Sequence, residues 1–429
     1  MCIFPEEIIE RILKHCDGKT LLIAYAVNEQ WKNIIQRLTK RTKIWKRNCL
    51  RDIPKGELVK YTEKYINQND IDKWLNIYKN WCAWQDIDGN IEFDIHLSPI
   101  EVSRITSIAV SGRYVAVGSE DGRIKIFNDN WDLLHTTRYQ AIKITEITFM
   151  CDEEYFEARN GRIYVLIAYK TGTLVLTEFD GKLNELSVIQ DVKLHSVYKK
   201  YLCYEKRGGR ITISKLCKNS MGTNVFCEIT FLRIYSPSEV SCLHMWGGTA
   251  TFLINNEVKV LKYDENVPPI SIPERRVRIK FCINNHPRLE RSCHIYRDDI
   301  IICASTTEDD LREQFLELFI LGEKGSYSKK LFNTWDVLES YITCMFLYGN
   351  TFIIGVDIGN IYFYHISSWK EFDIRNYQKK MIVGRHPING IDVREDSHQR
   401  KFYVHSSFKV HEITGLRVND YQYDLHCGV

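Results

Sequence analysis

Apolar and polar positions follow two different periods along the chain, and the period changes near residue 91. Before this point, apolar residues recur at intervals of three and four, which is typical of helices with one apolar face. After it, short apolar runs alternate with turns rich in Gly, Asn and Asp, which is typical of β-strands. The pattern therefore predicts a small all-α segment followed by a larger all-β segment.

The first helix is predicted to begin at Pro5, which fixes φ and lacks an N–H that would be unpaired there anyway. Glu6 and Glu7 place negative charge in the first turn, where it complements the helix dipole. Asp17 and Gly18 end the helix. One apolar face is expected to comprise Ile8, Ile9, Ile12, Leu13 and Cys16.

Two more helices are predicted before residue 45. Thr20 can cap a short helix that carries two adjacent leucines, and Asn28 is suited to cap the next one. The third helix would present Trp31, Ile34, Ile35 and Leu38 on one face. Helices this short bury little apolar surface, so we expect a partner to cover part of it. The alternative is an ordinary helical bundle packed on the rest of the chain.

A helical linker is predicted between the first helices and the strands. Leu58, Tyr61 and Tyr65 share one helix face, and Asp70 can cap a further helix with Trp74 and its apolar neighbours on one side. The predicted boundaries are 1–50 for the first helices, 51–90 for the linker and 91–429 for the β-segment.

The β-segment repeats a unit of three strands separated by tight turns, most clearly over 105–129. Similar units cover 144–180, 197–216, 240–264, 293–321, 342–365 and 388–413. About seven units at this spacing predict a β-propeller of about seven four-stranded blades. Because a propeller must close, the alternating segment 91–97 is expected to supply the missing outer strand of the last blade.

Composition excludes several classes of protein. The 429 residues are 44% hydrophobic with a net charge of +3, which is ordinary for a globular protein and indicates no nucleic-acid or membrane partner by itself. No apolar stretch approaches the roughly 20 residues of a membrane span. The 14 cysteines are scattered without a Cys-x-x-Cys pair, so we expect them reduced, in a cytoplasmic or nuclear protein.

Catalytic and metal-binding motifs are absent from the sequence. It contains no Gly-x-Gly-x-x-Gly, no His-Glu-x-x-His and no Gly-x-Ser-x-Gly. We therefore expect no catalytic residue, no cofactor and no metal, and interpret the chain as a non-enzyme.

The segment 268–291 is basic and is predicted to be a long connection between blades. Arg276, Arg278 and Lys280 alternate with Val277 and its apolar neighbours, so one face can be basic and the other buried. This segment could bind an acidic partner or nucleic acid. A solvated insertion is the interpretation that we favour.

The first fifty residues resemble an F-box, through Phe4-Pro5, then Leu21-Leu22, then Val27 and Trp31, and finally Trp45. An F-box performs no chemistry and joins a protein to the Skp adaptor of a cullin-RING ubiquitin ligase. The resemblance implies that the adaptor is contacted by Phe4, Pro5, Ile8, Leu21, Leu22, Val27 and Trp31. It places Ile12, Leu13, Ile35 and Trp45 in the internal core.

The repeated units resemble WD-repeat blades, and the whole chain resembles the F-box/WD-repeat family. Propellers of this family bind targets on one rim, in some cases with arginines in the turn between the second and third strands. Here those turns carry Glu120, Lys170, Arg207 and Asp357, with Thr106 and Thr145 at the starts of first strands. Lys170 and Arg207 are the candidate substrate-binding residues. Surface charge without function is the alternative interpretation.

These observations predict a substrate receptor of a Skp–cullin–F-box ubiquitin ligase, with an unidentified protein as its substrate. Two alternatives stay open. The chain could be a propeller scaffold outside any ligase, or it could bind an acidic partner or nucleic acid through 268–291.

Overall fold

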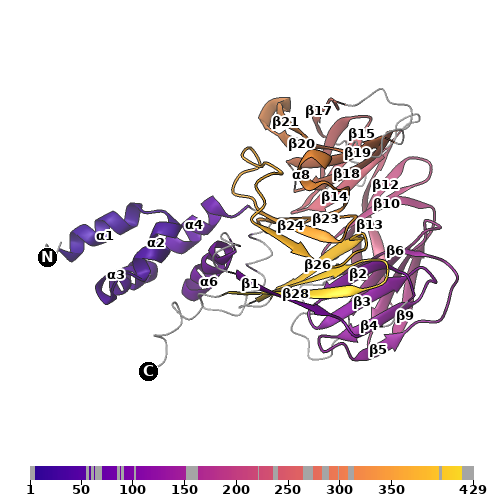
Figure 1. Cartoon of the computed structure of the whole chain (residues 1–429), viewed down its shortest axis with the longest axis horizontal. Coiled ribbons are helices and arrows are strands. Elements are labelled where there is room, and N and C mark those ends of the chain that lie inside the picture. Colours follow the sequence, from indigo (N-terminus) through magenta and orange to yellow (C-terminus); the bar gives the residue numbers. More distant parts are fainter. Residues whose placement is uncertain are drawn as a thin grey trace.

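The computed structural model describes most of the chain, which consists of short helices followed by a β-propeller (Figure 1). The described residues are 5–54, 58, 62, 70–84, 87, 91–100, 103–150, 163–220, 222–234, 240–263, 274–282, 289–297, 299–307, 314–395 and 399–417. Phe4 lies outside them, as do the side chain of Arg275 and most of the segment around Tyr61 and Tyr65.

The helices project from one side of the propeller, and the first three lie farthest from it (Figure 1). They are α1 (Glu6–His15), α2 (Gly18–Tyr25), α3 (Glu29–Arg41), α4 (Ile44–Asp52) and α6 (Asp70–Ala83). No helix among the described residues has the length and apolar character to cross a membrane.

Side-chain caps start two of these helices where polar residues precede an apolar run. Asn28 Oδ1 accepts a hydrogen bond from the Trp31 N–H at 2.9 Å, which confirms the predicted cap of α3. At α2 the prediction was wrong, because the cap is Asp17 rather than Thr20. Asp17 Oδ1 accepts the Thr20 N–H at 2.7 Å, and the helix begins one residue later.

The helices share one apolar core. Leu13, Leu21, Ile34, Ile35, Leu38 and Trp45 are buried in it, together with Ile77 and Tyr78 of α6. Gly18 lets α2 lie directly on the Tyr78 ring, because a Cβ at this position would come within 2.2 Å of the ring. The helix α6 therefore belongs to the same packed unit as the first helices, called the helical unit below.

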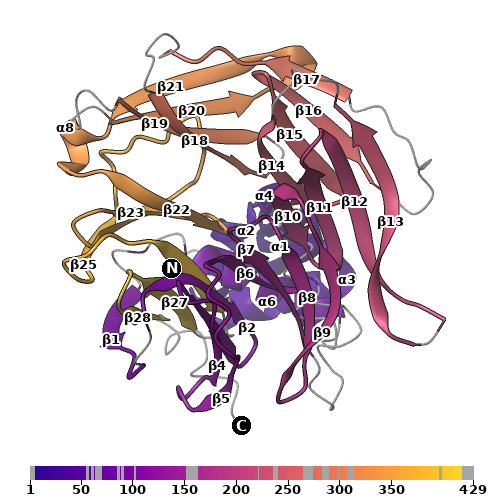
Figure 2. The same cartoon turned by 90° about the vertical axis from the view of Figure 1, so that its right-hand side faces the viewer.

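Seven antiparallel sheets of four strands form the propeller, as predicted (Figure 2). Blade 1 comprises β2 (Ile105–Ser111), β3 (Tyr114–Ser119), β4 (Ile124–Asn128) and β5 (Leu133–Thr136). Blade 2 comprises β6 (Ile144–Met150), β7 (Ile163–Tyr169), β8 (Leu174–Phe179) and β9 (Leu183–Ile189). Blade 3 comprises β10 (Val192–Tyr198), β11 (Tyr201–Lys206), β12 (Arg210–Lys218) and β13 (Asn224–Arg233).

The remaining blades follow in chain order. Blade 4 comprises β14 (Val240–Trp246), β15 (Thr249–Ile254), β16 (Glu257–Lys262) and β17 (Glu274–Arg278). Blade 5 comprises β18 (Leu289–Tyr296), β19 (Ile300–Thr307), β20 (Gln314–Leu321) and β21 (Tyr327–Asn333), with short η1 (Glu323–Gly325) and α8 (Trp335–Leu338) beside it. Blade 6 comprises β22 (Ile342–Tyr348), β23 (Thr351–Val356), β24 (Asn360–His365) and β25 (Lys379–Ile382). Blade 7 comprises β26 (Gly390–Glu395), β27 (Gln399–His405), β28 (Val410–Arg417) and β1 (Ile91–Leu97).

The ring closes by pairing strands from opposite ends of the β-segment. The strand β1 pairs with β28 in antiparallel register, with Ile95 opposite Ile413, and so completes blade 7 as predicted. This pairing gives blade 7 four strands like the other blades and ties the start of the β-segment to its end.

The first strands of neighbouring blades contact each other around the centre of the ring (Figure 2). Side chains reinforce several of these contacts. Ser107 Oγ accepts the N–H of Ile147 at 2.9 Å, and Asp392 Oδ2 accepts the N–H of Val110 at 2.7 Å. Both bonds cross from one blade to the next and end on the N–H of an innermost strand.

The basic segment 268–291 is not simply a connection between blades. Its residues Glu274–Arg278 form β17, the outer strand of blade 4. Val277, Ile279 and Phe281 are buried, while Arg278 and Lys280 are exposed. The predicted alternation is therefore confirmed, whereas the expectation of a solvated insertion was wrong for this part, because the buried face packs against blade 5.

We expect the stability of the propeller to depend on pH through His405, which is buried at the end of β27. Burial lowers the pKa of His405 to about 4, against about 6.5 in an unfolded chain. Between pH 6.5 and pH 4, His405 is protonated in the unfolded chain but not in the folded one, so acidification favours unfolding. The contribution of His405 to the free energy of unfolding should fall by about 2 kcal/mol between pH 7 and pH 5.

Urea denaturation at both pH values measures this effect. His405→Gln should show a weaker dependence on pH than the wild type. An equal loss in both proteins would contradict the role of His405.

Candidate protein-interaction surfaces

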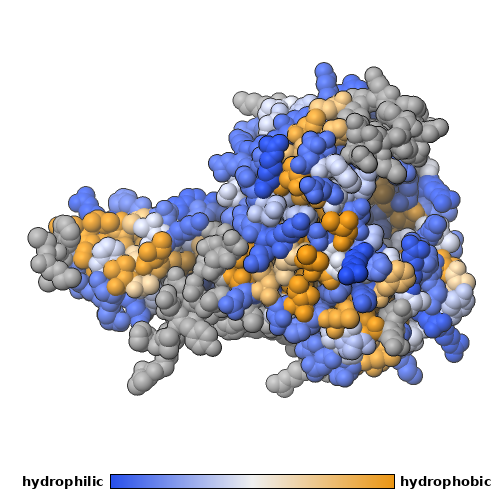
Figure 3. Space-filling view, viewed as in Figure 1, coloured by the Kyte–Doolittle hydropathy of each residue, from blue (hydrophilic) through white to orange (hydrophobic). Residues whose placement is uncertain are grey.

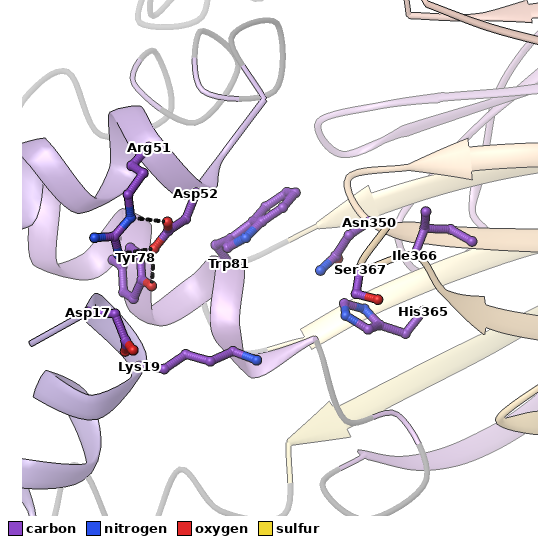
Figure 4. A pocket seen from close by; sticks show the side chains of 10 residues that line it. All are labelled: Asp17, Lys19, Arg51, Asp52, Tyr78, Trp81, Asn350, His365, Ile366 and Ser367. Carbon is purple, nitrogen blue, oxygen red and sulfur yellow. Dashed lines mark hydrogen bonds and ion pairs between the residues drawn. The ribbon is translucent and has the colours of Figure 1, made fainter. Parts of the chain in front are cut away.

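The topology separates the propeller into two faces. Turns between first and second strands, and between third and fourth strands, lie on one face, and the remaining turns lie on the other. The helical unit lies on the first face, because Lys19 and Trp81 line a cleft with Asn350 of the β22–β23 turn and Ser367 after β24 (Figure 4). The opposite face, called the far face below, is turned toward the viewer in Figure 2.

A buried ion pair of blade 7 lies where the helical unit meets the propeller. The side chains of Arg400 and Glu395 are 0% and 2% exposed, and Arg400 Nε lies 2.6 Å from Glu395 Oε1. The Arg400 guanidinium lies 4.1 Å from the ring centre of Trp84, at the end of the helical unit. Tyr348 OH donates to Glu395 Oε2 at 2.9 Å, and Arg400 Nη1 donates to Thr351 at 3.2 Å.

Two further contacts complete this joint. Asn80 of α6 lies with its Nδ2 3.5 Å from Glu395 Oε1. Trp84 packs so closely on β28 that a Cβ at Gly415 would come within 3.1 Å of its ring. Blades 6 and 7 therefore hold the end of α6 through stacking, hydrogen bonds and an ion pair, which we call the Arg400 joint.

The cleft between the helical unit and the propeller has a volume of about 400 Å³. Its polar groups on the helical side largely satisfy one another, because Asp52 accepts Arg51 Nε at 2.6 Å and Tyr78 OH at 2.6 Å (Figure 4). Burial alone would raise the pKa of Asp52, but these two hydrogen bonds outweigh it and the pKa is lowered. This arrangement serves the packing of α4 on α6 and indicates no ligand.

The end of the helical unit farthest from the propeller carries exposed apolar side chains (Figure 3). On α1, Ile8 is 45% exposed and Ile12 is 53% exposed; on α2 and just after it, Ile23 is 66% exposed and Val27 is 56% exposed. Ile8 and Ile12 are four residues apart within α1, so they lie on the same face of that helix. These four residues are called the helical tip surface below.

The residues implied by the F-box resemblance divide into three groups. Pro5, Ile8 and Val27 are exposed, and Trp31 is half-buried. Leu21 and Leu22 are both buried in the helical core, at 0% and 8% exposed. Both leucines hold α2 in place, and their contact with a partner stays a prediction.

The expected internal residues are buried with one exception. Leu13, Ile35 and Trp45 lie in the core, but Ile12 does not and belongs to the helical tip surface. Periodicity placed Ile12 and Leu13 on one broad apolar face, whereas only Leu13 points toward α3. Ile23, which directly follows two buried leucines, was not singled out from the sequence.

On the far face, one backbone hydrogen bond recurs in several blades. The first residue of the turn between the second and third strands donates its N–H to the residue that precedes the first strand of the same blade. The pairs are Glu120 to Arg104, Lys170 to Lys143, Arg207 to Asp191 and Asp357 to Tyr341, at 2.7–3.0 Å. The neighbours of the candidate residues are therefore Lys143 and Asp191, and not the first-strand threonines considered from the sequence.

These pairs distribute charge unevenly around the far face. Glu120 forms an ion pair with Arg104 at 3.6 Å, and Arg207 is tethered beside Asp191. Blade 2 instead places Lys143 and Lys170 side by side. Lys170 and Arg207 thus lie on the same face in adjacent blades, and Lys143 is a third basic residue that sequence reasoning missed.

Among the described residues, no group of three or more His, Cys, Asp and Glu side chains could hold a metal ion. The candidate sites of the described chain are therefore two surfaces. One is the apolar helical tip surface, and the other is the far face with its basic residues, on the opposite side of the Arg400 joint.

No protein family model matches the chain, and no curated protein matches it in sequence. Similar solved structures include Sqt1 of Saccharomyces cerevisiae, at 9% identity over 76% of this chain and 99% of that one, with a TM-score of 0.49. A chain of the mitotic checkpoint complex is 13% identical over 76% of this chain and 94% of that one, with a TM-score of 0.47. The seven-bladed assignment therefore rests on the strand pairing described above.

We expect Arg400→Met to destabilise the protein strongly, because it leaves the Glu395 carboxylate buried without its partner. Breaking a buried pair from one side costs about 3–5 kcal/mol. Urea denaturation followed by tryptophan fluorescence measures the loss. The double variant Arg400→Met with Glu395→Gln should recover a large part of it, and equal stability of the two variants would contradict the buried-charge explanation.

Proposed function

We propose that this chain is the substrate receptor of a Skp–cullin–F-box ubiquitin ligase. In this proposal the helical unit is an F-box that binds the Skp adaptor, and the propeller binds the protein to be ubiquitinated. The chain transfers no ubiquitin itself. The single observation that carries the proposal is the helical tip surface, an apolar surface on a packed helical unit whose order of residues resembles an F-box.

The energetics of the helical tip surface support a protein partner. Its four side chains are branched and apolar, and each is about half exposed. Full burial of such a side chain from water contributes about 1.5–3 kcal/mol, so covering the exposed half would contribute about half of that. A cluster of this kind at the end of a soluble helical unit marks an interaction site more readily than scattered single residues would.

The Arg400 joint supports the proposal that the helical unit binds the adaptor while the far face of the propeller binds the target. A receptor must hold its target at a fixed distance and orientation from the ubiquitin-loading enzyme, because loss of orientation slows transfer. Stacking of Trp84 on Arg400 holds the helical unit against blades 6 and 7. The far face is thereby directed away from the adaptor-binding end (Figure 1).

The far face suggests where a target binds. Lys143, Lys170 and Arg207 lie on two adjacent blades and would attract an acidic segment. Arginine can also bind two oxygens of a carboxylate or a phosphate at once. We therefore assign this part of the far face to the acidic segment of a target protein.

We expect the double variant Ile8→Asp with Val27→Asp to weaken binding to the Skp adaptor at least 100-fold. Both side chains are exposed, so the substitutions place charge in the interface while leaving the helical core intact. Isothermal titration calorimetry with purified adaptor measures the affinity, and circular dichroism checks the helices.

Leu50→Asp is the matched control, because Leu50 is an apolar residue of α4 that is 61% exposed and lies outside the helical tip surface. It should bind like the wild type. Failure of the wild-type chain to bind the adaptor at all would reject the ligase proposal and leave a propeller scaffold as the better interpretation.

We expect Lys143→Glu with Lys170→Glu to reduce capture of target proteins at least fivefold, because two charges on the far face are reversed. Capture is quantified by mass spectrometry with the Ile8→Asp/Val27→Asp chain as background, so that bound targets are not delivered for degradation. Lys182→Glu is the control, since Lys182 lies in the β8–β9 turn on the opposite face. Unchanged capture by the double variant would exclude blade 2 from target binding.

A further inference from the structure

Two cysteines face each other across the first two strands of blade 5. Cys293 of β18 and Cys303 of β19 are direct partners in the antiparallel register, and their Sγ atoms lie 2.9 Å apart. Directly opposite residues of such a ladder have Cα atoms about 4.5–5.5 Å apart. This separation falls within the roughly 4.4–6.8 Å between the Cα atoms of a disulfide.

The two thiols differ in access to solvent. Cys303 is completely buried at the interface of blades 4 and 5, whereas Cys293 is half-buried on the innermost strand of its blade. A small oxidant can therefore reach Cys293 first. Cys303 is then already in contact with the oxidised sulfur and shielded from reacting elsewhere.

The surroundings also give the two thiols different reactivity. The Cys303 thiol donates a hydrogen bond to Cys293, and this bond lowers the pKa of Cys293. Burial opposes the shift, and the nearby Arg291 guanidinium supports it. Burial raises the pKa of Cys303. Glu317, directly opposite Cys303 on β20, opposes the effect on Cys293 but is itself paired with Lys329 at 2.8 Å. Cys293 is therefore the better nucleophile of the two.

We propose that Cys293 and Cys303 form a reversible disulfide when the protein meets hydrogen peroxide. The Cys293 thiolate attacks one peroxide oxygen, the O–O bond breaks, and the sulfur becomes a sulfenic acid with loss of hydroxide. Cys303 Sγ then attacks the Cys293 sulfur, the S–O bond breaks, and one water leaves. Overall, two thiols and one hydrogen peroxide give one disulfide and two waters, and a dithiol reductant reverses the step.

The disulfide would link β18 to β19 within one blade. It lies next to blade 4, because Cys242 of β14 packs into the same buried cluster. The oxidised propeller should unfold at a higher temperature than the reduced one, because the bond restricts the unfolded chain between the two strands. This site is independent of the helical tip surface and of the far face.

Tryptic peptide mapping without reduction tests the proposal on the full chain. Trypsin cleaves after Arg291, Arg297 and Arg312, so that Cys293 and Cys303 fall in separate peptides, 292–297 and 298–312. After treatment with hydrogen peroxide, these peptides should appear as one linked species, and dithiothreitol should separate them. Thermal unfolding of the same samples should show a higher Tm for the linked form.

Cys227 is the internal reference, because it is an exposed thiol and reports that the oxidant has acted. Full oxidation of Cys227 with peptides 292–297 and 298–312 still unlinked would overturn the proposal, as would a link from Cys293 to Cys242. Cys293→Ser should abolish the linked species, and Cys203→Ser should preserve it, since Cys203 is a buried thiol opposite Ser196 and Ile213. The wild-type map decides the question even if a variant folds poorly.

Discussion

The buried pair of Arg400 and Glu395 is the constraint on which the arrangement of the two parts depends. A guanidinium removed from water is costly unless its charge and its N–H groups are satisfied. Here Glu395 neutralises the charge, Thr351 accepts an N–H, and the Trp84 ring covers one side of the guanidinium. Because Trp84 belongs to the helical unit and the other residues belong to blades 6 and 7, satisfying this one cation also sets the position of the helices.

Closure of the ring determines where the helical unit is attached to the propeller. The pairing of β1 with β28 brings the start of the β-segment back to blade 7, immediately after α6. The helical unit is thus attached at the seam of the ring, both through the chain and through the Arg400 joint. The turns at the two ends of the blades then lie toward and away from the helices, and the far face is left uncovered by them (Figure 2).

Much of the fold could be predicted from the sequence, because it depends on local patterns. Period-two runs and tight turns predicted the seven blades, and the alternating segment before blade 1 predicted the closing strand. The alternation within β17 was recognised, but its place as the outer strand of blade 4 was not, since that place depends on pairing with β16. Lys143 was missed because its place beside Lys170 depends on a backbone hydrogen bond between residues 27 positions apart. Arg400 could not be predicted as buried, because its partner Trp84, just after α6, is far from it in the sequence.

The helices show why a resemblance in sequence and a surface in space are different kinds of information. Periodicity identifies residues that share a helix face. The apolar face of α1 is broader than its contact with α3, so part of this face stays exposed to water. On α1, Ile9 and Leu13 occupy the contact, and Ile8 and Ile12 remain outside it. On α2, the two leucines turn inward and Ile23 turns outward. The buried half stabilises the helical unit, so the exposed half is available to a partner without unfolding it. That separation is what a docking module needs, because the surface that binds can then change its partner while the core that holds it stays the same.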